Sequence, residues 1–243
     1  MTVRFGLLIS AILLVRCSSD PAPTLTVATS LSSTTSIIRD AASRDCGSGG
    51  TVCTGSPSTM TMKIYEAYVS LNTDCSSPIL VSNFGASGAD ISVGVQNLIS
   101  ANPAAGTYRC LILKMSDNLR FTPNAAAIAA FPGVCTAAVA GSTFDIYRTD
   151  SGDNGLWKNL DGTAITATGS GATAGDNTVY IFATTTPSAV TGGSLHVHTN
   201  QTVTLTAPLV VPGQTTFYVD FANGVTGSGG ICKIEGGTGM GFR

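Results

Sequence analysis

The chain has 243 residues, of which 43% are hydrophobic and only 11% are charged, and its formal net charge is −2. The hydrophobic share excludes an intrinsically disordered chain, and the scattered lysines and arginines exclude the concentrated positive surface that nucleic-acid binding needs. Globular proteins usually carry about 25% charged residues. Here glycine, serine, threonine and alanine take their place, which is typical of secreted and cell-surface β proteins.

The first predicted element is an export signal at residues 1–16. Arg4 supplies a positive start, and residues 5–15 (FGLLISAILLV) form an apolar run. A helix needs about 20 residues to cross a bilayer, so this run is too short to span one. It has the length of the apolar region of a signal peptide. The sequence therefore predicts export to the cell envelope.

Cys17 follows this run directly. The letters LVRC resemble a bacterial lipobox, in which the cysteine becomes the lipidated N-terminus of the mature protein. Leu14 and Val15 fit that pattern, whereas Arg16 stands where a small residue is usual. Lipidation of Cys17 is predicted, with the membrane as partner through the attached acyl chains. Because of Arg16, cleavage by an ordinary signal peptidase after Ser19 stays open.

Polar residues dominate the segment that follows Cys17. The stretch SSDPAPTLTVATSLSSTTS is predicted as a flexible tether that holds a domain clear of the lipid surface. The predicted organisation is a signal peptide at 1–16, a lipid-anchored tether with a Cys46–Cys53 loop at 17–58, and a β-sandwich domain at 59–243.

The cysteine count supports export independently. Of the seven cysteines, the leader assignment removes Cys17, and an even set in an exported chain is typical of disulfide bonds. Cys46 and Cys53 flank the glycine-rich loop GSGGTV and form the one predicted pair, while the remaining connectivity stays open. No CxxC spacing points to zinc. The disulfide candidates are Cys46, Cys53, Cys75, Cys110, Cys135 and Cys232.

Short apolar runs separated by turn residues predict many strands. Residues 60–71 change their apolar phase near Glu66, which predicts a β-bulge there. Residues 107–115 are apolar on both faces, which predicts a central strand. The other predicted strands are 78–82, 142–148, 177–185, 194–206, 214–222 and 231–235.

One short helix is predicted near 123–133, started by Pro123 and Asn124 and stopped by Pro132 and Gly133. Helices do not alternate with strands, so an α/β fold is disfavoured. The predicted fold class is all-β: an antiparallel β-sandwich, immunoglobulin-like or related, with long loops rich in glycine and threonine.

Two stretches carry a family resemblance. AAGTYRCLIL (104–113) and QTVTLTAPLVVPGQTTFYVDFANGV (201–225) resemble a strand entry and a later hairpin of immunoglobulin-like or transthyretin-like sandwich domains in bacterial, spirochaete-type lipoproteins. The resemblance covers about a third of the mature chain and implies a sandwich fold and a surface setting. The matching positions are Gly106, Tyr108, Pro212, Gly213, Asp220 and Phe221.

Two places in the sequence offer candidate metal ligands, but no metal or cofactor is predicted. His196 and His198 would share one face of a strand, but no spacing supplies the third ligand that a metal site requires. Asp150 and Asp153 begin a run of oxygen ligands around Trp157 that lacks the closing glutamate of a calcium loop, so it is predicted to be a solvated turn. That run also includes Asn154, Asn159 and Asp161, with Asp145 just before it.

No nucleophile elbow, phosphate loop or zinc-protease motif occurs in the sequence. The predicted function is therefore that of a non-enzymatic cell-envelope lipoprotein, at the outer membrane or cell surface, with a binding or structural role. Its protein or glycan ligand is not identified by the sequence. Two alternatives remain: a secreted or periplasmic metal-dependent hydrolase using His196 and His198, and a subunit of a surface assembly that pairs through edge strands.

Overall fold

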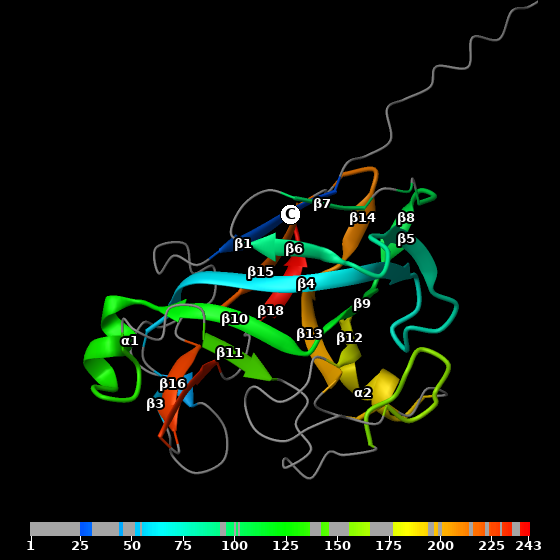
Figure 1. Cartoon of the computed structure of the whole chain (residues 1–243). Helices are drawn as coiled ribbons and strands as arrows, with labels where there is room; N and C mark the ends of the chain where they lie inside the picture. The colour runs from blue at the N-terminus through cyan, green and yellow to red at the C-terminus, as the bar shows by residue number, and fades with distance from the viewer. Residues whose placement is uncertain are drawn as a thin grey trace, which may run out of the picture.

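The computed structural model describes residues 25–30, 44–45, 52–53, 55–92, 96–99, 101, 103–136, 142–145, 156–165, 177–193, 197–198, 201–213, 216–221, 224–228, 230–234 and 239–243. The all-β prediction is confirmed (Figure 1). The strands of the first half are β1 (Leu25–Ser30), β2 (Arg44–Asp45), β3 (Val52–Cys53), β4 (Pro57–Ser70), β5 (Ile79–Asn83), β6 (Ala89–Ser92), β7 (Gln96–Ile99), β8 (Gly106–Tyr108), β9 (Cys110–Ser116) and β10 (Asn118–Pro123).

The second half adds helices and further strands: α1 (Ala125–Ala130), β11 (Ser142–Asp145), β12 (Thr178–Thr184), α2 (Pro187–Thr191), β13 (Thr202–Ala207), β14 (Leu209–Val211), β15 (Thr216–Asp220), β16 (Val225–Ser228), β17 (Ile231–Ile234) and β18 (Gly239–Phe242). The sequence prediction of a single helix was wrong, because α2 is also present. The proline that opens α2 takes a first-turn position, where its missing N–H costs nothing.

The long strand β4 organises the fold. Its inward side chains change from Met62 and Ile64 to Ala67 and Val69, and its pairing with β9 shifts register between Ile64 and Glu66. The bulge predicted from the sequence is therefore confirmed. It lets one strand keep apolar residues inward along its whole length while it bends around the core.

The predicted central strand is also confirmed, because β9 lies between β4 and β12. Leu111 and Leu113 pack into the main core on one face, while Cys110 and Ile112 pack into a second apolar cluster on the other. A strand buried on both faces shows no apolar–polar alternation, which is the pattern that residues 107–115 have.

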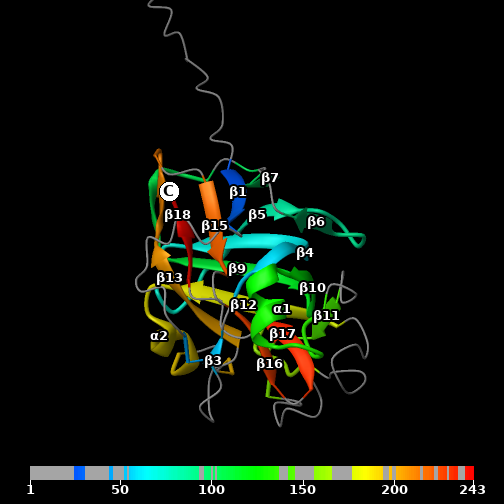
Figure 2. The ribbon, with the colours of Figure 1, turned by 90° about the vertical axis from the view of Figure 1, so that its left-hand side faces the viewer.

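The described strands of the main sheet follow the order β11-β10-β4-β9-β12-β13-β18-β15-β1-β7, with β5 and β6 on the other edge of β4. The strands around β4 pair antiparallel, as predicted. The antiparallel prediction was wrong for three pairings, because β13 pairs parallel to β12 and β18, and β1 pairs parallel to β15. The other two pairings in this part of the sheet, β15 with β18 and β1 with β7, are antiparallel. Figures 1 and 2 show the result, a mixed sheet that curls around its core.

The curl brings the far end of the strand order back to β4. The amide of Ala101, just after β7, donates to the carbonyl of Val81 in β5 at 2.9 Å. The Ser82 hydroxyl donates to the carbonyl of Leu98 in β7. These bonds place β7 beside β5, so the inner face of the sheet encloses the main core. The deeply buried rings of Phe217 and Phe242 pack there, with centroids 5.4 Å apart.

The second apolar cluster lies on the other face of β9 and β12. Ile112 and Phe182 supply the sheet side, and Val190 of α2 covers them. The disulfide between Cys75 and Cys110 lies in this cluster and ties the 71–78 loop to the start of β9. The loop and α2 therefore form a partial outer layer over the sheet.

Helix α1 confirms the predicted short helix. The Asn124 side chain caps it by accepting from the Ala127 amide at 2.9 Å, which satisfies an N–H that the first turn leaves free. Figure 1 shows α1 at one end of the sheet. Just beyond α1, a disulfide between Cys135 and Cys232 joins the segment to β17.

The predicted tether at 17–58 contributes strands that the sequence did not predict. β1 pairs in register with β15, from Thr26 opposite Thr216 to Ser30 opposite Asp220. The backbones of β2 and β3 form a small hairpin. In the described part of the chain, the helices fall short of the length and apolar character that crossing a bilayer requires.

One buried glutamine joins three parts of the fold. The Gln201 side chain is fully buried, and its amide nitrogen donates to the carbonyls of Lys158 and Tyr180 at 2.8 and 3.0 Å. Its carbonyl accepts from the amides of Lys158 and His198 at 2.7 and 3.2 Å. All four hydrogen-bonding positions of the side chain are thus used. Gln201 fastens the 156–165 loop to β12.

Candidate functional site

An open cavity of about 470 Å³ lies beside the bulge of β4. Its walls come from strands that are far apart in the sequence, namely β4, β9 and β12 together with the turn after β5. The lining residues are Tyr65, Glu66, Asn83, Gly85, Ala86, Lys114 and Thr178. A volume in this range suits a small ligand.

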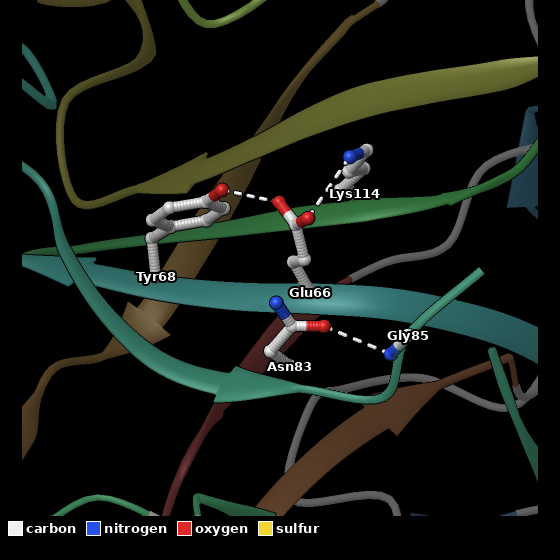
Figure 3. Close-up of polar contacts among 5 residues, drawn as sticks. All are labelled: Glu66, Tyr68, Asn83, Gly85 and Lys114. Atoms are coloured by element: carbon white, nitrogen blue, oxygen red, sulfur yellow. Dashed lines mark hydrogen bonds and ion pairs between the residues drawn. The ribbon is translucent and has the colours of Figure 1, made fainter.

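The centre of the site is an ion pair at the bulge (Figure 3). Lys114 of β9 donates to Glu66 Oε1 of β4 at 2.9 Å, and the two side chains keep 29% and 17% of their surface exposed. The hydroxyl of Tyr68 donates to the other carboxylate oxygen. Both oxygens of Glu66 are therefore held by donors, which fixes the carboxylate in one orientation.

The electrostatics of the site keep both charges in place. Partial burial raises the pKa of Glu66, but the hydrogen bonds from Tyr68 and Lys114 outweigh it and leave that pKa below its ordinary value. The hydrogen bond to Glu66 raises the pKa of Lys114. Burial, and then the bond to Glu66, raises the pKa of Tyr68. At neutral pH the site is an ionised, overall neutral pair with a neutral phenol.

The opposite wall of the cavity is a tight turn. Asn83 lies opposite Glu66 in the pairing of β5 with β4, and its side-chain oxygen accepts from the Gly85 amide at 2.8 Å (Figure 3). Gly85 has φ of +73°, a conformation that favours glycine. The turn therefore holds the amide group of Asn83 at the cavity edge.

This arrangement suits binding more than nucleophilic chemistry. A nucleophilic lysine needs a lowered pKa, whereas Glu66 holds Lys114 in its protonated form. Within the described residues, no group of three or more histidine, cysteine, aspartate or glutamate side chains is arranged to hold a metal ion. The residues that line the cavity include both hydrogen-bond donors and hydrogen-bond acceptors, together with the aromatic residue Tyr65.

Replacing Glu66 with glutamine is expected to lower the free energy of unfolding by about 1 kcal/mol at pH 7, because the pair is partly buried. The folded-state pKa of Glu66 lies below its ordinary value of 4.5. Its contribution is therefore complete above that value and disappears as the pH falls through the folded-state pKa. Urea unfolding of both proteins at pH 7 and at about pH 3 measures the difference.

An exposed, non-ionisable position provides the control for this experiment. Thr185→Ala should differ from the wild-type protein by the same small amount at both pH values. A difference between wild type and Glu66→Gln that stays constant down to pH 3 contradicts the assigned role of the pair.

The cysteine prediction is confirmed where the structure describes it. Cys75 pairs with Cys110, and Cys135 pairs with Cys232. The predicted pairing of Cys46 with Cys53 is not tested, because Cys46 lies outside the described residues. Cys17, the predicted lipidation site, also lies outside them.

Of the two histidines and two aspartates that are candidate metal ligands, only one lies among the described residues. His196, Asp150 and Asp153 lie outside the described residues. His198 is described, and it precedes β13, which begins at Thr202, so the predicted strand over 194–206 starts later than expected.

The acidic run around Trp157 behaves as predicted where it is described. Asp161 accepts from the backbone amide and hydroxyl of Thr163 at 2.9 and 2.7 Å, as in a solvated turn. Trp157 is 1% exposed and packs in the main core.

The cavity itself was not predicted from the sequence. Glu66 was identified only as the position of the bulge, and Lys114 lies 48 residues further along the chain. The available signal was that Glu66 and Lys114 are charged residues inside apolar strands. Buried charges need partners of opposite charge, so such residues are candidates for an ion pair.

Comparison of the chain with protein-family models, with curated proteins and with solved structures finds no match.

Proposed function

We propose that this chain is an exported cell-envelope lipoprotein, anchored through Cys17, whose β domain binds a ligand and does not catalyse a reaction. The observation that carries the proposal is the cysteine chemistry. The four cysteines that the structure describes with their side chains are all paired in disulfides. Disulfides persist in oxidising compartments outside the cytosol.

The remaining cysteines fit the same proposal. Strands β2 and β3 pair with Asp45 opposite Val52 and Arg44 opposite Cys53, and Cys46 follows Asp45 in the sequence. A Cys46–Cys53 bond would complete three disulfides and leave Cys17 as the odd cysteine, free to carry lipid. This parity is what an exported lipoprotein needs.

The intact mass of the native protein tests the proposal. A mature chain that begins at Cys17 and carries two or three acyl chains is expected, with a further mass increase of six hydrogens after reduction of three disulfides. More than one acyl chain is required for stable attachment. An unmodified chain that begins after Ser19 contradicts anchoring but leaves export intact. Recovery of the full chain with reduced thiols contradicts both.

The sandwich assignment remains part of the proposal. Tyr108 is buried, and its hydroxyl donates to the carbonyl of Ala104 at 2.7 Å, four residues upstream. Immunoglobulin-like sandwiches use a tyrosine in this way at a strand corner, two residues before a cysteine, and Cys110 stands at that spacing here. The two resembling stretches also meet, because β8 pairs with β14, from Gly106 opposite Val211 to Tyr108 opposite Leu209.

A binding role is supported by the cavity beside β4. Its fixed, overall neutral ion pair and the Asn83 amide favour a neutral ligand rich in hydroxyl groups over a highly charged one. Such a ligand is consistent with a glycan partner. The alternative of a metal-dependent hydrolase depends on His196 and the acidic run, and metal analysis of the purified protein addresses it directly.

A further inference from the structure

Three exposed apolar side chains form what we call the apolar rim: Leu71, Ile79 and Leu80, which are 51%, 45% and 43% exposed. Leu71 directly follows β4, and the other two begin β5. The pairing of β4 with β5 places Ile79 opposite Val69 and Leu80 opposite Tyr68, so the rim residues lie at the same end of this strand pair, with Ile79 and Leu80 on alternate faces of β5. Grouped exposed apolar residues mark an interaction surface, whereas single ones do not.

The rim lies at the end of the domain where β1 begins. Leu25, the first residue of β1, pairs with Ile99 of β7, and the amide of Ala101 donates to Val81, next to Leu80. Figures 1 and 2 both show the start of β1 beside β7. The chain ahead of β1 therefore joins the domain close to the rim.

The chain ahead of β1 is short. Residues 18–24 separate Cys17 from Leu25, and at no more than about 3.6 Å per residue this segment spans at most about 29 Å. A lipid on Cys17 must therefore hold this end of the domain near the membrane. Strand β4, with its 14 residues, reaches roughly 45 Å from the rim to the opposite end, where α1 lies.

The charge beside the rim fits a lipid surface. Arg109 is exposed, and its amide donates to the carbonyl of Ser70, next to Leu71, at 2.9 Å. Asp74, in the loop that joins Leu71 to Ile79, supplies one opposite charge, so the rim is flanked by one cation and one anion, and the cation is the group that anionic lipid headgroups attract.

We propose that the apolar rim contacts the membrane to which Cys17 attaches the chain, with Arg109 at the level of the lipid headgroups. This inference rests on the proposed lipid anchor. It adds an orientation: the rim faces the bilayer, and the α1 end faces away from it.

Quenching of tryptophan fluorescence by brominated phospholipid tests the orientation. The acylated protein is reconstituted in vesicles of phosphatidylethanolamine and phosphatidylglycerol, as Leu80→Trp and, in case that variant fails to fold, Ile79→Trp. Ala129→Trp on the exposed face of α1 is the matched control, and the buried native Trp157 gives a constant background. Emission from the rim variants is expected to fall about twofold, and emission from the control to stay unchanged.

The outcomes separate the orientation from the anchor. An acylated, vesicle-bound protein whose rim variants are quenched no more than Ala129→Trp overturns the orientation and leaves the anchor standing. A dimer in detergent that Leu80→Asp disrupts also overturns it, because the rim is then an interface between copies. A chain without acyl groups, by intact mass, overturns the anchor and the orientation with it.

Discussion

Replacement of Gln201 with alanine is expected to lower the free energy of unfolding by about 3–5 kcal/mol. The change removes one side chain and, with it, four hydrogen bonds to the surrounding backbone: those to the amide and carbonyl of Lys158, the carbonyl of Tyr180 and the amide of His198. An unsatisfied buried polar group costs about 1–3 kcal/mol. Some of these groups gain water when the site opens, so the estimate lies below the full sum.

The size of this effect follows from what Gln201 replaces. The amide of Lys158 donates to the Gln201 side chain, and the carbonyl of Lys158 accepts from it. The backbone groups of a residue are used in the same way when it pairs with a neighbouring strand. The 156–165 loop thus reaches β12 through the Gln201 side chain. Urea unfolding at pH 7, followed by the fluorescence of Trp157 in the same loop, measures the loss.

Two further variants test whether the lost hydrogen bonds of Gln201 cause the loss of stability. Gln201→Glu keeps the size of the side chain but loses both donors, so it should be at least as destabilising as the alanine variant. Thr204→Ala, at an exposed position of β13, should change stability by less than about 0.5 kcal/mol. Wild-type stability in Gln201→Glu would show that the two carbonyl contacts contribute nothing.

Removal of the Cys135–Cys232 disulfide, as the double alanine variant, is expected to cost about 2–5 kcal/mol. The bond closes a loop of 97 residues, compared with 35 residues for Cys75–Cys110. If the bond acts by restricting the unfolded chain, the longer loop contributes about 1 kcal/mol more than the shorter one. Thermal unfolding of the two double variants under one set of conditions ranks them.

The native structure adds a second reason for this ranking. Strands β16 and β17 pair only with each other among the described strands, so the hairpin has no sheet to join. The Cys135 bond and the close approach of Phe131 to Gly227, where an added Cβ would lie 2.7 Å from the ring side chain, hold it against the α1 segment. A larger loss on removing Cys75–Cys110 would contradict this account.

Local patterns in the sequence predicted the elements whose cause is local. The Asn124 cap and the Pro132-Gly133 stop define α1, and the phase change at Glu66 defines the bulge. The apolar composition of 107–115 placed β9 in the centre of the sheet, because only a strand covered on both sides carries such a run.

Elements that depend on distant partners were not predicted. β1 (LTVATS) lies in a polar, serine-rich segment and is a strand because β15 and β7 flank it. β18 (GMGF) is glycine-rich, and an added Cβ at Gly241 would lie 2.7 Å from the Tyr218 hydroxyl, so close packing favours glycine there. The ion pair at the cavity and both described disulfides also join residues with no detectable spacing rule. The even number of cysteines after Cys17 predicted that they form disulfides, but it did not predict which cysteines pair.

The parallel pairing of β1 with β15 has a mechanical consequence for a domain that is held by its N-terminal end. The two strands share five consecutive residue pairs, and parallel hydrogen bonds are evenly spaced along a strand. A force on the chain ahead of Leu25 that is directed along β1 acts in shear and loads all of these pairs together, whereas a force across the strand opens them one at a time. If the proposed lipid on Cys17 holds the chain, β1 should therefore resist pulling along its own axis far better than peeling.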